Sequence, residues 1–225
     1  MEHILDNPIW HALNTGNAGL ALGNEMAKYY PTDIAFFAGM PNTSTTSFEE
    51  LYQIIPRAVS GIELMEELEI PRPWTVIRPV KVLQFIYAGS DVQQNDNGLI
   101  VLNETHVPQM LALTQLTDPG PFLQRTIEMG HYYGIFDNDK LVAMAGQRMN
   151  PIPYAEISAV CTHPDYVGKG YASKLLLFHI NRIMAAGQIP FLHVLSNNQR
   201  AIQVYGRLGF IVRKEATIYV IKKEL

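Results

Sequence analysis

The chain has little cysteine, little basic charge and no long apolar run. Its single cysteine, Cys161, excludes an internal disulfide framework and a cysteine-rich metal site. The 17 Lys and Arg residues are outnumbered by 21 Asp and Glu residues, and the net charge of −4 argues against a globally basic nucleic-acid binder. No run reaches the roughly 18 apolar residues that a membrane span needs. The first six residues lack the pattern of a signal peptide, so we expect a cytoplasmic protein without membrane or nucleic-acid partners.

The composition that is present suits a globular protein. With 225 residues, of which 48% are hydrophobic, the chain is long enough to close a sizeable core in one or two domains. The charge is divided unevenly, because residues 165–225 carry nine bases and three acids whereas residues 1–164 carry eight bases and eighteen acids. A cationic tail suggests a compact anionic ligand such as a phosphorylated cofactor. The alternative is that these bases form ordinary solvated helix faces. The histidines of the chain show no spacing typical of metal ligands, so we expect no bound metal.

A polar stretch rich in turn residues, 89–98, divides the chain into an N-terminal α/β region, 1–95, and a second domain, 96–225. In the first region the pattern predicts a helix over 8–30, a buried strand over 33–40 and a short helix over 47–55. Helical turns over 63–69 and a strand over 75–88 follow. Pro79 interrupts that strand, which predicts an edge position or a bend.

The second domain alternates strands and helices. The pattern predicts helices over 104–116, 122–129, 171–186 and 199–208 and strands over 154–162 and 190–195. A hairpin joins 131–136 to 141–149, and a closing hairpin joins 210–216 to 217–222. A strand, a helix and a further strand in this order imply parallel neighbours joined by a crossover helix.

A glycine turn stands between the predicted strand 154–162 and the following helix. Gly168 and Gly170 let the backbone approach a ligand closely, and the free N–H groups of the first helical turn then point at it. Lys169 adds a positive charge, and the Ser173 hydroxyl can donate to a phosphate oxygen. The turn is neither a Walker A loop nor a dinucleotide fingerprint, because residue 163 is His and residue 173 is Ser where those motifs need Gly.

Two further stretches accompany this turn. The sequence HPDYVGKGYA at 163–172 is followed by PFLHVLSNN at 190–198 and by the pattern N-x-x-A-x-x-x-Y-x-x-x-G-F at 198–210. Together they resemble the GNAT superfamily of acyl-CoA-dependent N-acyltransferases. The resemblance implies an α/β (α+β) GNAT fold, in which helices flank a mixed central sheet. Residues before the boundary resemble the glycine-N-acyltransferase-type subset, in which a degenerate GNAT-like half precedes the active one.

The resemblance implies acetyl-CoA as the cosubstrate and assigns a set of residues to it. The strand main chain pairs with the pantetheine arm, the glycine turn holds the pyrophosphate and an asparagine side chain contacts the arm. The implied cofactor-binding residues are Val160, Cys161, Thr162, Val167, Gly168, Lys169, Gly170, Tyr171, Ala172, Ser173 and Asn198. Val167 departs from the family pattern, which has Gln or Arg there, so we expect weaker cofactor binding.

The resemblance also places Tyr205 at the position of the general acid. A phenol with a pKa of roughly 10 can protonate a departing thiolate, whose pKa is roughly 8.5. The alternative for Tyr205 is a core aromatic residue. Glu156, on the strand before the turn, can act as the base directly or through water. The alternatives for Glu156 are an exposed edge acid and a substrate-binding carboxylate. We expect no covalent role for Cys161.

The sequence therefore predicts transfer of an acyl group from CoA to a primary amine in a ternary complex, and acetyl is the expected acyl group. The acceptor is a small-molecule or peptide amine of unknown identity, and a homodimer is the candidate assembly. Two alternatives stay open: a non-catalytic acyl-CoA sensor and an aminoacyl-tRNA-dependent transferase. The acidic balance of residues 1–164 argues against the second, which needs a basic RNA-facing surface.

Overall fold

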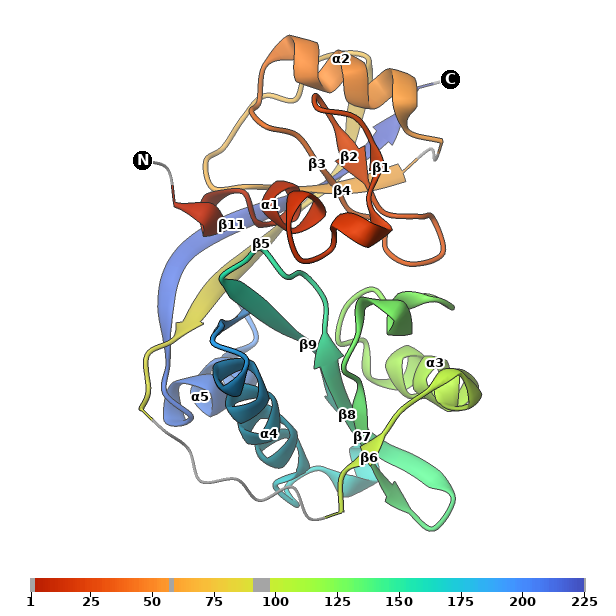
Figure 1. Cartoon of the computed structure of the whole chain (residues 1–225), viewed down its shortest axis with the longest axis vertical. Coiled ribbons are helices and arrows are strands. Elements are labelled where there is room, and N and C mark those ends of the chain that lie inside the picture. The colour runs from red at the N-terminus through yellow and green to blue at the C-terminus, as the bar shows by residue number, and fades with distance from the viewer. Residues whose placement is uncertain (1–2, 57–58, 91–97, 225) are drawn as a thin grey trace.

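The computed structural model describes residues 3–56, 59–90 and 98–224 (Figure 1). The predicted boundary between the parts 1–95 and 96–225 falls in 91–97 and lies outside the described residues. The α-helices are α1 (Pro8–Asn14), α2 (Thr45–Ile54), α3 (Val107–Thr117), α4 (Tyr171–Ala185) and α5 (Gln199–Arg207). Within these described ranges, none of the helices has both the length and the apolar character needed to span a bilayer.

Eight strands form one mixed sheet in the order β4-β11-β5-β10-β9-β8-β7-β6. Only β9 and β10 run parallel, and every other neighbouring pair is antiparallel. A separate small sheet has the order β1-β2-β3. This architecture confirms the predicted α/β class, with helices flanking a mixed central sheet (Figure 1). The strands are β1 (Leu22–Gly23), β2 (Lys28–Tyr29), β3 (Ala38–Gly39), β4 (Val59–Leu64), β5 (Trp74–Tyr87), β6 (Ile100–Val101), β7 (Tyr133–Asp137), β8 (Lys140–Gln147), β9 (Tyr154–Thr162), β10 (Ile189–Leu195) and β11 (Phe210–Lys223).

The N-terminal part supplies two strands of the main sheet. β5 lies between β10 and β11, and β4 pairs with the outer side of β11. β10 pairs with β5 only over residues 82–86, so Pro79 has a strand neighbour on one side, where it faces Tyr219 of β11. That one-sided pairing confirms the predicted edge position, because proline lacks the N–H that a second neighbour would need.

Several predicted elements of the N-terminal part are wrong. The predicted helix over 8–30 ends at Asn14, because the following stretch is rich in glycine, the weakest helix former after proline. Of the predicted strand over 33–40, only Ala38–Gly39 is a strand. The predicted helical turns over 63–69 are also wrong. Glu63 and Leu64 are the last residues of β4, which pairs with β11, and residues 65–69 form neither a helix nor a strand.

The elements from residue 154 onward follow the prediction closely until the last one. β9, α4, β10 and α5 coincide with their predicted ranges to within one residue. The predicted closing hairpin is wrong, because β11 continues from Phe210 to Lys223 without a reversal. Register shifts at Val212/Lys214 and Val220/Ile221 bend this strand, where the sequence suggested a turn.

The two faces of the sheet carry different parts of the chain. On β10, Phe191 packs with residues of α1, whereas the next residue, Leu192, packs with residues of α4. Successive strand residues point to opposite faces, so the N-terminal segment and α4 cover opposite faces of the sheet (Figure 1). Met144 of β8 faces α3, and its neighbour Ala143 faces α4. α3 therefore shares its face with the N-terminal segment.

Candidate functional site

The centre of the site is the point where β9 and β10 separate. Their parallel pairing covers only 154–156 on β9 and 189–191 on β10. Beyond Glu156, among the described residues, the edge of β9 that faces β10 has no ladder partner. On its other side β9 pairs with β8, with a register shift between Met144 and Gly146. Ala159 lies opposite this shift with φ of +53°, so the strand bulges in the segment that is open toward β10.

The three predicted strand residues lie on this open segment of β9. Val160 packs against α4 with its side chain, and Cys161 is buried. Burial raises the pKa of the Cys161 thiol to about 12, so it carries no thiolate at neutral pH. The Thr162 hydroxyl is buried and has no hydrogen-bond partner among the described residues. The main chain of 160–162 is thus placed at the opening, while the Cys161 side chain belongs to the core.

The glycine turn leads from β9 into α4. Gly168 and Gly170 have φ of +89° and +78°, a conformation that side chains with a Cβ adopt at a cost. A Cβ added at either glycine would meet no described atom within 4 Å, so the outer side of the turn is open. Gly170 is the N-cap of α4, and no described side chain caps that end. The first-turn N–H groups of a 15-residue helix therefore remain available, together with the positive end of its dipole.

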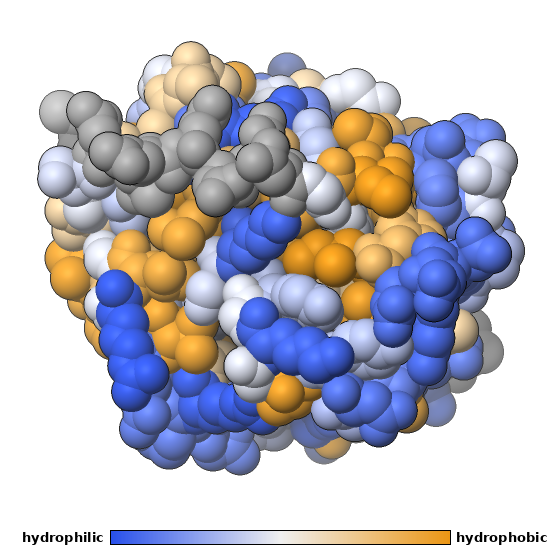
Figure 2. Space-filling model, turned by 90° about the horizontal axis from the view of Figure 1, so that it is seen from below, coloured by the Kyte–Doolittle hydropathy of each residue, from blue (hydrophilic) through white to orange (hydrophobic). Residues whose placement is uncertain are grey.

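Side chains around the turn add exposed lysines and a group of aromatic rings. Lys169 Nζ lies 4.4 Å from the ring centre of Tyr166, and Tyr171 stacks on the same ring. Val167 is 42% exposed and offers no polar group. Ala172 and Ser173 lie in the first turn of α4 and are half-buried. Figure 2 views this end of the molecule, where hydrophilic and hydrophobic residues are interspersed.

Two further predicted residues lie at the start of helix α5 and within it. Asn198 is its N-cap, and Oδ1 accepts a hydrogen bond of 3.1 Å from the Ala201 N–H. Tyr205, two turns further along, is buried and packs edge-on against Phe85 and Phe210. Burial raises the pKa of Tyr205 to about 12, so the phenol stays protonated at neutral pH and can serve as a hydrogen-bond donor or acid.

Glu156 is completely buried at the last position where β9 pairs with β10. Arg148 donates to both of its oxygens, from Nε at 2.9 Å and from Nη2 at 2.6 Å, and the Met149 N–H donates to Oε2. Burial alone would raise the pKa of Glu156, but Arg148 and His193 outweigh it and lower the pKa to about 2. Its role as base stays a prediction, and these contacts make it a weak proton acceptor.

His193 is the residue that sequence reasoning missed. Its ring is buried between two carboxylates: Nδ1 is 2.8 Å from Glu156 Oε1 and Nε2 is 2.8 Å from Glu63 Oε1. Burial alone would lower its pKa, but Glu63 and Glu156 outweigh it and raise the pKa of His193 to about 9. Glu63, Arg148, Glu156 and His193, here called the buried charge network, thus hold two negative and two positive charges.

The network leaves one weak signal in the sequence, because His193 is the only polar residue in the run PFLHVL. Its members lie 8 to 130 residues apart on four segments, and these separations match no known motif. Across the described residues, no group of three or more His, Cys, Asp or Glu side chains is arranged to hold a metal ion.

Comparisons with known proteins agree with this geometry. The model of the FR47-like protein family matches residues 132–220. A GNAT-family protein from Novosphingobium aromaticivorans DSM 12444 is 32% identical over 100% of both chains, and its crystal structure superposes with a TM-score of 0.92. No curated protein matches the chain.

Two more distant structures share the fold. A GCN5-related N-acetyltransferase from Kribbella flavida is 14% identical over 97% of this chain and 96% of its own, with a TM-score of 0.61. A GNAT-family acetyltransferase from Colwellia psychrerythraea is 16% identical over 88% of this chain and 82% of its own, with a TM-score of 0.54. Given the full-length match to the Novosphingobium protein and a site built at the same strand, turn and helix that the sequence motifs mark, this chain belongs to the GNAT family.

Proposed function

We propose that the protein is an acyl-CoA-dependent N-acyltransferase that transfers an acyl group, with acetyl as the expected one, to a primary amine. The observation that carries this proposal is the uncapped glycine N-terminus of α4, which follows the segment of β9 that is open toward β10. Such a helix end binds phosphate groups through main-chain N–H donors. Membership of the GNAT family supports acyl-CoA as the donor of the acyl group.

The residues at this end of the molecule fit a CoA thioester. The N–H groups of 168–172 would bind the pyrophosphate, with Lys169 and Ser173 as the side chains within the turn. The open edge of β9 at 160–162 would hold the pantetheine arm as an added strand. The open space beside Gly168 and Gly170 leaves room for this approach. Val167 contributes no polar contact, which favours modest affinity.

The thioester supplies the activated acyl group, and the residues of this chain manage charge and protons. The amine nitrogen bonds to the carbonyl carbon, the carbon–sulfur bond breaks, and the thiolate takes up one proton while the nitrogen loses one. Transfer from Tyr205, with a pKa of about 12, to a thiolate is uphill. The proton that the amine releases can return to Tyr205, so the phenol ends unchanged. A hydrogen bond from Tyr205 to the developing thiolate already stabilises the departing sulfur.

The base is the open part of this mechanism. Glu156 could accept a proton only if its contacts with Arg148 and His193 weakened during the reaction. A second candidate function, a non-catalytic acyl-CoA sensor, is favoured by that engaged carboxylate and by Val167. The homodimer, the cytoplasmic location and the likeness of residues 1–95 to glycine-N-acyltransferase-type proteins stay predictions.

The test measures turnover with acetyl-CoA and a panel of primary amines. The release of free thiol reports the rate. Tyr205→Phe should lower kcat by a factor of about 100 or more, the usual worth of a general acid, with acetyl-CoA still raising the melting temperature. Tyr87→Phe is the matched control, because Tyr87 packs on the same Phe210 ring but donates its hydroxyl to the Ser90 carbonyl.

Unchanged turnover in Tyr205→Phe would remove the phenol from the mechanism. Stabilisation of the wild type by acetyl-CoA without thiol release for any amine would favour the sensor. If acetyl-CoA neither binds nor turns over, the proposed function is wrong.

A further inference from the structure

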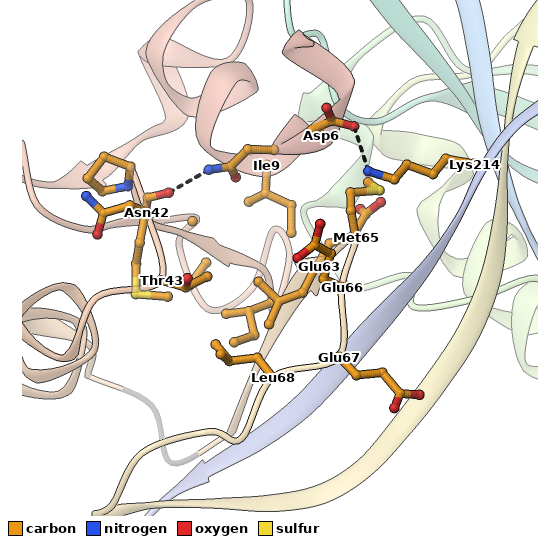
Figure 3. Close-up of a pocket in the computed structure, with 17 residues that line it drawn as sticks. Asp6, Ile9, Asn42, Thr43, Glu63, Met65, Glu66, Glu67, Leu68 and Lys214 are labelled. Carbon is orange, nitrogen blue, oxygen red and sulfur yellow. Dashed lines mark hydrogen bonds and ion pairs between the residues drawn. The ribbon is translucent and has the colours of Figure 1, made fainter. Parts of the chain in front are cut away.

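A cavity of about 430 Å³ lies between the N-terminal segment and β4 (Figure 3). Its volume falls within the roughly 300–1,000 Å³ of small-molecule sites. Four carboxylates line it, and Lys214 is its cationic lining residue. The carboxylates belong to Asp6, Glu63, Glu66 and Glu67. Their contacts decide which of them has charge left to offer a ligand.

Two of the four carboxylates are neutralised by neighbours. Asp6 Oδ1 lies 2.7 Å from Arg213 Nη2 and 3.5 Å from Lys214 Nζ. Glu67 Oε1 lies 2.7 Å from Lys81 Nζ. The lysine of the cavity is thus directed at Asp6 (Figure 3), and neither of these carboxylates attracts a further cation strongly.

Of the other two carboxylates, Glu63 keeps one oxygen without a partner and Glu66 keeps an unpaired charge among the described residues. The Glu63 side chain is fully buried, and its Oε1 forms the ion pair with His193. Its Oε2 is also buried and has neither a hydrogen bond nor an ion pair among the described residues. Glu66 is exposed and pairs with no cation in the described part of the chain. A buried carboxylate oxygen without a donor is costly unless a ligand supplies one.

The cavity is connected to the opening of β9 through a single side chain. Glu63 contacts Nε2 of His193, and Nδ1 of the same ring contacts Glu156, the residue at which the β9–β10 pairing ends. The lining residue Glu63 is thus one imidazole ring away from the strand that would hold the thioester. A small ligand seated in the cavity would lie beside the reaction centre on the face opposite α4.

We propose that this cavity binds a small amine with at least two amino groups, one of which is held as an ammonium ion by Glu63 and Glu66. The proposal rests on the proposed function and names its acceptor class. A nitrogen must be neutral to attack a thioester, so an ammonium group held by carboxylates is not the reacting group. A substrate anchored here therefore needs a second amino group to receive the acyl chain.

The first experiment measures binding calorimetrically, without CoA, using 1,4-diaminobutane and the neutral 1,4-butanediol, which has no ammonium group, as probes. We expect the diamine to bind more tightly. Glu63→Gln should weaken it about tenfold or more, because a hydrogen bond to a charged group is lost in a buried place. Glu66→Gln should weaken it up to about fivefold, the range for an exposed ion pair. Glu69→Gln, the same charge change in the same segment outside the cavity, should leave binding unchanged.

Equal binding of the two probes would overturn the proposal, as would equal effects of Glu66→Gln and Glu69→Gln. If Glu63→Gln does not fold, the exposed Glu66→Gln decides. A second experiment, thiol release from acetyl-CoA, separates this proposal from the proposed function. Transfer to butylamine as fast as to the diamine refutes the cavity and keeps the function. Glu66-dependent diamine binding without thiol release keeps the cavity and refutes the function.

Discussion

The glycine turn and the buried charge network lie toward opposite ends of β9 and are built in opposite ways. The turn, 167–173, uses main-chain groups of consecutive residues, and both of its glycines lie in the open. The network uses side chains from β4, the end of β8, β9 and β10, and its ion pairs are almost wholly removed from water. One part is a surface feature encoded locally, and the other exists only once four segments have assembled.

This difference predicts different consequences of mutation. Main-chain donors at a helix end need only glycines of the right conformation, so a change there should affect ligand binding more than folding. A buried charge is tolerated only while its partner is present, so a change in the network should affect folding first. The three predictions below test this contrast, beginning with the largest effect.

Removing Arg148 should destabilise the protein most. Arg148→Met deletes the two guanidinium donors to Glu156 and leaves a buried carboxylate with His193 as its remaining ionic partner. The loss of one partner of a buried ion pair costs about 3–5 kcal/mol of unfolding free energy. Denaturant unfolding at neutral pH measures it.

The matched control is Lys81→Met, which breaks the exposed pair with Glu67 and should change stability little. The double variant Arg148→Met/Glu156→Leu should recover part of the loss, because it removes the uncompensated charge. If Arg148→Met lowers the unfolding free energy no more than Lys81→Met does, the buried charge network contributes no more to stability than an exposed ion pair.

Raising the pH should weaken the network at His193 while Arg148 stays in place. The pKa of His193 is about 9 in the folded protein and about 6.5 in an unfolded chain, so the folded state binds its proton more tightly. That stabilisation is complete below pH 6.5 and is lost as the pH rises through 9. Unfolding free energies measured across this window should fall with increasing pH, by less than the loss in Arg148→Met.

His193→Gln should flatten this decline, since the variant has no proton to lose there. Where that variant is too unstable, the imidazole resonances of the wild type report the same titration by NMR. A titration of His193 near pH 6.5 would contradict the contacts with Glu63 and Glu156.

The same contrast explains how much the sequence could predict. From β9 to α5 the pattern of apolar residues, glycines and caps is local, and the predicted elements coincide with the observed ones. In the N-terminal part, the first two residues of the acidic stretch 63–69 belong to β4, whose partner β11 comes from distant residues, so the local pattern wrongly suggested helical turns. The continuous β11 was likewise hidden, because its partner β5 comes from the other end of the chain.

Among the candidate site residues, those of the glycine turn could be predicted from the sequence, and the buried charge network could not. Gly168, Gly170 and Tyr205 stand in motifs with fixed spacing, so sequence reasoning could name them. Glu156 could be named as an acid, but its low pKa depends on Arg148 and His193, which no spacing links to it. Prediction from sequence succeeds here for groups that neighbours along the chain determine, and fails for charges whose partners come from distant segments.

The smallest expected effect on the unfolding free energy comes from replacing a single glycine by alanine, at Gly170 or at Gly206. Gly170 has φ of +78°, where a Cβ costs about 1–2 kcal/mol, so Gly170→Ala should lower the unfolding free energy by about that much. Gly206, inside α5, has an ordinary helical φ and an equally open surrounding. There the same substitution should raise stability by about 0.5–1 kcal/mol, because alanine is the better helix former. Denaturant unfolding of the two variants gives the signs, and acetyl-CoA titration should show weakened binding for Gly170→Ala. Equal signs would mean that the glycine turn is not held in the left-handed conformation on which its open main-chain donors depend.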